Sequence, residues 1–140
     1  MTTVHIARAV GSTGTTAAKY RVEVRVGAHQ LIADEPVAAG GGDVGPSPFG
    51  LVLSGLVACT ATTLRIYAAR KGWELATIEV EVRYDVDRDG QRAIERTITV
   101  PVGLNEEQRA HLADIAERTP VTLAIRDGTS ITTTFQTNDD

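Results

Sequence analysis

Cys59 is the side chain of this sequence best suited to covalent chemistry, and it is the only cysteine. A thiol becomes an effective nucleophile as the thiolate, which a permanent nearby cation stabilises. Arginine is the natural source of that charge, and the candidates are Arg8, Arg21, Arg25 and Arg65. On a helix, Arg65 would lie about 240° around the axis from Cys59, so it is not on the same face. The alternative is that Cys59 is an inert small hydrophobe in a core.

Other familiar site patterns are weak. His5, His29 and His111 are scattered along the chain without the spacing of metal ligands. The run GGGDVG at residues 40–45 lacks the lysine of a phosphate-binding loop and the preceding buried strand. We therefore expect neither a metal ion nor a bound cofactor.

A long helix must position Cys59. Ser47 is a good N-cap, Pro48 suits the first helical position, and Lys71 with Gly72 is typical of a helix end. Apolar residues point in nearly every direction around this helix of about 24 residues, which predicts that it is buried. One line along it holds Pro48, Val52, Gly55, Cys59, Thr63 and Ile66.

The rest of the chain predicts an α+β fold. Alternating residues indicate strands at 4–10, 20–26 and 30–33, with a turn or loop at 11–16, and then a hairpin of 73–86 with 94–102. Asn105 should cap a second helix that ends near Thr119, before Pro120, and 121–125 with 130–135 should form a last hairpin. The glycine-rich residues 34–48 favour an ordered loop over a flexible linker. We expect antiparallel sheets around two helices in a single domain, residues 1–140.

Composition narrows the choice of partners. The net charge of −4 argues against nucleic acid and against an anionic membrane surface. Ser54, Gly55 and Arg65 interrupt the apolar helix, so a membrane span is not expected. The first residues lack the pattern of a secretory signal, and a single cysteine fits a reducing compartment, so the expected location is the cytoplasm.

Three segments together resemble one known family. They are ADEPVAAGGGDVGPSPFGLVLSGLVACTATTLRIYAARKGWEL, the strand TIEVEVRY, and LADIAERTPVTLAI. This combination is similar to the OsmC/Ohr family of osmotically induced proteins and organic hydroperoxide resistance proteins, from about residue 20 to residue 135. The resemblance implies an α+β fold with a long buried central helix and a second helix, in which two chains intertwine as an obligate homodimer with sites at the interface.

The resemblance also implies a chemistry. Family members with peroxidase activity use a cysteine on the central helix as the nucleophile, and Cys59 matches it. A second cysteine, opening a CPV motif, resolves the sulfenic acid as a disulfide; here the motif reads TPV and Thr119 replaces that cysteine. A glutamate at the helix start orients an activating arginine in the family, whereas this chain has Phe49 and Gly50 there.

Two functional hypotheses follow. The first is an oxidative stress response enzyme, a one-cysteine peroxidase in which Cys59 attacks an organic hydroperoxide and an external thiol or dithiol serves as reductant. The second is a non-catalytic OsmC-like dimer that binds a small apolar ligand or senses redox state. An exposed Cys59 with an arginine in reach would favour the first, and a buried Cys59 among small residues and threonines would favour the second.

Overall fold

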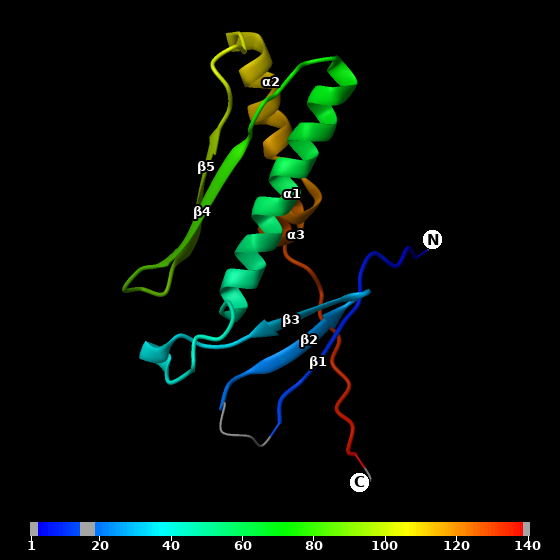
Figure 1. Cartoon of the computed structure of the whole chain (residues 1–140), viewed down its shortest axis with the longest axis vertical. Helices are drawn as coiled ribbons and strands as arrows, with labels where there is room; N and C mark the ends of the chain where they lie inside the picture. Colours follow the sequence, from blue (N-terminus) through cyan, green and yellow to red (C-terminus); the bar gives the residue numbers. More distant parts are fainter. Residues whose placement is uncertain (1–2, 15–18, 139–140) are drawn as a thin grey trace. The chain divides into compact units, whose positions relative to one another are not determined.

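The structure, a computed structural model, describes residues 3–14 and 19–138. These residues form an α+β arrangement with two small antiparallel sheets and three α-helices, as expected (Figure 1). The chain divides into two compact units, Met1–Ser54 and Gly55–Asp140. The long helix α1 begins in the first unit and continues into the second.

The first unit is built on a three-stranded antiparallel sheet of order β1–β2–β3. Its strands are β1 (Ala9–Ser12), β2 (Val22–Val26) and β3 (His29–Ala33). The strands predicted at 20–26 and 30–33 are confirmed as β2 and β3, which pair as a hairpin. Gly27 lies in its turn at a φ of 59°. The first strand lies later than the predicted 4–10, because Gly11 and Ser12, where a turn is expected, pair with β2.

The glycine-rich loop after β3 is ordered, as predicted. It contains a short 3₁₀ helix, η1 (Val37–Ala39), and the backbone N–H of Asp34 donates to the carbonyl of Pro46 at 3.0 Å. A Cβ at Gly41 would lie 2.0 Å from the carbonyl oxygen of Glu35, and one at Gly45 would lie 2.1 Å from that of Ile32. These two positions therefore need glycine, because the backbone passes too closely for any side chain.

Helix α1 (Pro48–Lys71) has the predicted bounds. The Ser47 hydroxyl accepts a hydrogen bond from the Gly50 N–H at 3.0 Å, which satisfies one of the unpaired donors of the first turn. Gly72 follows the helix at a φ of 74°, a conformation that glycine adopts without strain. The local signals at both ends were sufficient to define this helix.

The burial of α1 differs from the prediction. Within the chain only one line of the helix is buried: Leu56, Thr60, Leu64 and Ala68. Val52 and Ile66 remain 46% and 47% exposed, so the expectation of a helix buried all round is wrong for the single chain. By length and apolar composition α1 could also cross a membrane, a test that core helices pass as well.

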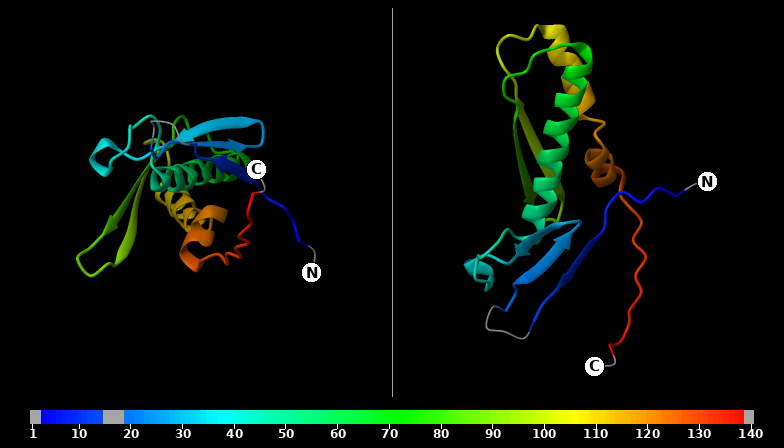
Figure 2. Two further views of the ribbon diagram at one scale, coloured as in Figure 1. Left: turned by 90° about the horizontal axis from the view of Figure 1, so that it is seen from below. Right: turned by 45° about the vertical axis from the view of Figure 1, so that its right-hand side comes forward.

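The second unit packs a hairpin and a helix against α1 (Figures 1 and 2). Strands β4 (Glu79–Val86) and β5 (Arg92–Thr99) pair in antiparallel register, with Val82 opposite Arg96. This confirms the predicted hairpin with shorter strands. Its core holds the buried residues Leu64, Ala68, Leu75, Leu112 and Ala116.

Helix α2 (Glu106–Ala116) begins at the predicted cap. The Asn105 side chain accepts from the Gln108 N–H at 2.8 Å, and the Gln108 side chain accepts from the Asn105 N–H at 2.9 Å. This reciprocal capping box satisfies two N-terminal donors. Leu112 and Ala116 of this helix are buried in the core.

The structure after Thr119 differs from the prediction. The predicted hairpin of 121–125 with 130–135 is wrong: residues Pro120–Asp127 form helix α3, and 130–135 have no regular structure. Pro120 ends the preceding segment but also suits the first position of a new helix, and Thr119 is its N-cap. The β-branched residues after Pro120 indicated a strand, and this local preference was overridden by the cap.

Candidate functional site

Cys59 lies in the middle of α1 and is only partly buried. Its Sγ atom is 4.0 Å from the Thr63 hydroxyl one turn later. Val52, Gly55 and Ile66 lie near the same line of the helix and are exposed. The sulfur therefore belongs to an apolar stripe of α1 that the chain itself leaves largely uncovered, rather than to the line that faces the core.

The buried line of α1 carries a polar group beside Cys59. Thr60 has no solvent exposure, and its hydroxyl donates to the Leu56 carbonyl at 2.7 Å. Such a bond back to the preceding turn is common for a threonine within a helix. The same hydroxyl also accepts a hydrogen bond from Arg96 Nη1 at 3.0 Å, which was not predicted.

Arg96 lies on β5 and joins several elements. Its Nη1 also donates to the Thr122 hydroxyl at 2.8 Å, and its Nη2 donates to the Ala116 carbonyl at 2.8 Å and to Glu117 Oε2 at 3.1 Å. The side chain is only 12% exposed. Sequence analysis missed this residue, although Arg96 occupies an inward position in the alternation of Ile94, Ile98 and Val100, and a charge at such a position is a usable signal.

Thr119, which the resemblance places where the family's second cysteine would be, belongs to the same cluster. Thr119 has no solvent exposure, caps α3 by accepting from the Thr122 N–H, and lies 2.6 Å from the Thr122 hydroxyl, oxygen to oxygen. Arg126 of α3 pairs with Glu117 at 3.1 Å, so one carboxylate serves two guanidinium groups. A network of hydroxyls and charges thus occupies the joint between α2 and α3.

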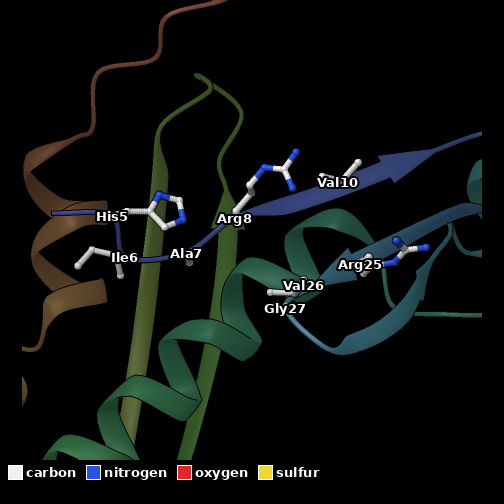
Figure 3. A pocket seen from close by; sticks show the side chains of 8 residues that line it. All are labelled: His5, Ile6, Ala7, Arg8, Val10, Arg25, Val26 and Gly27. Atoms are coloured by element: carbon white, nitrogen blue, oxygen red, sulfur yellow. The ribbon is translucent and has the colours of Figure 1, made fainter. Parts of the chain in front are cut away.

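The four arginines proposed as activators have different surroundings. Arg65 donates to the Leu75 carbonyl, and Arg21 pairs with Glu23 at 3.2 Å. Arg8 and Arg25 line a hollow of about 680 Å³ in the first unit. Figure 3 shows the segment from His5 to Arg8 on one side of this hollow and the end of β2 with its turn on the other. Among the contacts of the described residues, none joins an arginine to Cys59 Sγ.

At the helix start, where the resemblance implies a glutamate, this chain has Phe49 and Gly50. Phe49 is 52% exposed, and the Gly50 N–H is engaged by the Ser47 cap. Neither position supplies a carboxylate that could hold an arginine. The helix start here supports α1 itself, through its cap.

The electrostatically distinctive carboxylate of the first unit is Asp34, which is 2% exposed. Burial raises the pKa of this carboxyl, but hydrogen bonds from the backbone N–H groups of Val44, Glu35 and Gly42, with the nearby charge of Arg21, outweigh burial. The pKa of Asp34 therefore lies below its ordinary value. Its role is to hold the loop that leads into α1.

The fold is found in known crystal structures. A protein of Psychrobacter arcticus 273-4, described as a putative osmotic stress induced and detoxification response protein, matches with a TM-score of 0.69 at 20% identity, over 89% of this chain and 90% of that chain. The organic hydroperoxide resistance protein OhrB of Bacillus subtilis matches with a TM-score of 0.60 at 26% identity, over 87% of this chain and 91% of that chain.

A third match is an organic hydroperoxide resistance protein OsmC of Legionella pneumophila, with a TM-score of 0.65 at 21% identity, over 89% of this chain and 92% of that chain. No curated protein matches the sequence. The family model described as OsmC-like protein matches residues 40–134, which include α1, Cys59 and the α2–α3 joint. The chain therefore belongs to the family of OsmC-like proteins.

Proposed function

We propose that this protein reduces organic hydroperoxides through Cys59, with an external thiol or dithiol as reductant. The observation that carries the proposal is that Cys59 is partly exposed and lies on an apolar stripe of the central helix, in an OsmC-like fold. Val52 and Ile66 offer apolar contacts to the organic group of a substrate. The names of the matched proteins from Legionella and Bacillus support this substrate class.

The proposed reaction begins with attack of the Cys59 thiolate on the terminal oxygen of the hydroperoxide. The S–O bond forms as the O–O bond breaks, and the departing alkoxide takes a proton to become an alcohol. Cys59 is then a sulfenic acid. One external thiol condenses with it, releasing water and leaving a mixed disulfide. A second thiol attacks the reductant's sulfur in that disulfide, so that Cys59 leaves as a thiolate and the two reductant thiols end as a disulfide.

The reductant has to come from outside the chain, because Cys59 is the only cysteine. Thr119 stands where the family's second cysteine would be, and its hydroxyl cannot form a disulfide. A sulfenic acid that meets no thiol is open to irreversible oxidation by further peroxide. Turnover should therefore depend on the concentration of the external thiol.

A second candidate is a non-catalytic OsmC-like protein that binds a small apolar ligand or senses redox state. It is favoured by the surroundings of Cys59, whose sulfur has the Thr63 hydroxyl as its polar neighbour at 4.0 Å among the described residues. Phe49 and Gly50 in place of the family's glutamate point the same way.

The proposed assembly is an intertwined homodimer in the cytoplasm. Val52 and Ile66 are large apolar residues left about half exposed on α1, and a second copy would remove them from water. In this proposal, α1 is long and apolar because it packs against the second copy, not because it crosses a membrane. Nucleic acid is not a proposed partner, since the net charge is −4.

The deciding experiment measures the second-order rate constant for sulfenic acid formation, with cumene hydroperoxide and with hydrogen peroxide. Wild type is compared with a Cys59→Ser variant, which keeps the size of the side chain but removes the sulfur. A fast reaction that prefers the organic peroxide and vanishes in the variant supports the enzyme. A rate no higher than that of a free thiol rejects it and turns attention to ligand binding.

A further inference from the structure

Arg96 connects the helix turn that carries Cys59 to the start of α3. Its two terminal nitrogens make four hydrogen bonds, which end on α1 at Thr60, on the last residue of α2 at Ala116, on Glu117, and on α3 at Thr122. The side chain arises from β5. One side chain therefore touches each helix of the second unit.

The geometry requires a guanidinium group. Four acceptors lie around two nitrogens of one planar fork, an arrangement that a lysine ammonium cannot reproduce. The Ala116 carbonyl lies in the last turn of α2, where unpaired carbonyls and the helix dipole favour a cation. Burying this charge is unfavourable unless its donors are paired, and here Nη1 and Nη2 each donate two hydrogen bonds.

Thr60 makes the link to Cys59. Its hydroxyl accepts from Arg96 and donates to the Leu56 carbonyl, so the turn from Leu56 to Thr60 is held on the side facing the core. Cys59 lies within this turn and points toward the exposed stripe. The hydrogen bond from Arg96 to Thr60, on the buried side of α1, therefore limits rotation of this helix turn about the helix axis.

We propose that Arg96 is a positioning residue for Cys59: it fixes the orientation of the reactive sulfur through Thr60 and so sets the preference for organic over small peroxides. The inference rests on the proposed function and names a determinant within that same site. Arg96 acts through Thr60 and does not contact the sulfur. An oriented attack on a bulky substrate is sensitive to small displacements, whereas attack on hydrogen peroxide is much less so.

The test compares Arg96→Met, which keeps the length of the side chain, Arg96→Lys, which keeps the charge without the fork, and Arg83→Met as control. Arg83 lies on the neighbouring strand β4 and its side chain is 62% exposed. Rate constants of Cys59 with cumene hydroperoxide and hydrogen peroxide are measured below the melting transition of every variant. Hydrogen–deuterium exchange of residues 56–62 and 117–124 is followed in parallel.

Arg96→Met should lower the rate constant with cumene hydroperoxide by about tenfold to a hundredfold, with a smaller effect on hydrogen peroxide. Arg96→Lys should recover little, and exchange should become faster in both segments. Arg83→Met should match wild type. An unchanged preference between the two peroxides, or full recovery by Arg96→Lys, would overturn the inference.

Failure of the proposed function has a different signature. Wild type itself would then react no faster than a free thiol with either peroxide. The exchange data decide the inference in that case: faster exchange of residues 56–62 in Arg96→Met supports the positioning of Cys59, and unchanged exchange there rejects it.

Discussion

The carboxylate of Asp34 accepts a hydrogen bond from the backbone N–H of Gly42, eight residues later, at 3.1 Å. The same oxygen accepts from the Val44 N–H at 3.2 Å, and the other oxygen accepts from Glu35 at 2.7 Å. The end of β3 is thereby connected to the loop that precedes α1. One buried carboxylate thus holds together the glycine-rich loop that leads into α1.

Asp34→Asn should destabilise the first unit at neutral pH. An asparagine has a single acceptor oxygen. Its side-chain NH2 group would therefore stand opposite backbone N–H donors in place of one carboxylate oxygen, and those donors would lose their acceptor. Because the pKa of Asp34 is lowered in the folded state, its contribution is fully present above the unfolded pKa of about 3.9 and is lost as the pH falls through the folded value.

Urea unfolding of wild type and Asp34→Asn at several pH values measures this effect. The difference between their midpoints should be largest at pH 7 and should shrink in acid. A difference that does not depend on pH would contradict the role assigned to the charge.

Gly41→Ala and Gly45→Ala should each destabilise the protein by about 1–3 kcal/mol or more, because a Cβ would collide with a backbone carbonyl. Gly103→Ala is the matched control, since no atom lies within 4 Å of its added Cβ. Chemical denaturation monitored by circular dichroism compares the three variants. Equal stability of all three would show that the loop adapts to the new side chain.

Asn105→Ala should cost about 1 kcal/mol, because it removes the side-chain half of the capping box at the start of α2. Asn105→Ser keeps an N-cap oxygen and should retain most of the stability. The free energies of unfolding of both variants test the cap. A loss as large in the serine variant as in the alanine variant would indicate another role for Asn105.

Ile66→Glu should disrupt the proposed homodimer. A charged side chain in a contact between apolar faces is unfavourable unless it finds a partner. Ala58→Glu is the comparison, because Ala58 is an exposed residue of α1 that lies about 100° around the helix from Cys59.

Sedimentation equilibrium gives the mass of each form. Wild type and Ala58→Glu should sediment as dimers, and Ile66→Glu should have the monomer mass. A wild-type protein that is monomeric at micromolar concentration would reject the dimer proposal.

The sequence was sufficient wherever local chemistry decides the structure. Ser47, Pro48 and Gly72 define α1, because caps act within one turn of the helix end. Asn105 defines the start of α2 for the same reason. The family was also evident from the sequence, as its motifs around Cys59 are local and dense.

Tertiary structure decided the features that depend on distant residues. Gly11 and Ser12 belong to β1 because β2 lies beside them and pairs with them. Which face of α1 is buried depends on the elements that pack against it within the chain. The periodicity of its apolar residues does not identify those elements. Each of these outcomes depends on which segments meet in space.

The candidate site illustrates the same division. Cys59 could be identified from the sequence, because a single cysteine on an apolar helix is a local property. The cluster of Arg96 with Thr60 and Thr122 could not be identified in this way. Thr60 lies 36 residues before Arg96 and Thr122 lies 26 residues after it, and the three meet only when the helices pack. A buried guanidinium is stable only when several acceptors converge on it, and the tertiary structure alone brings them together.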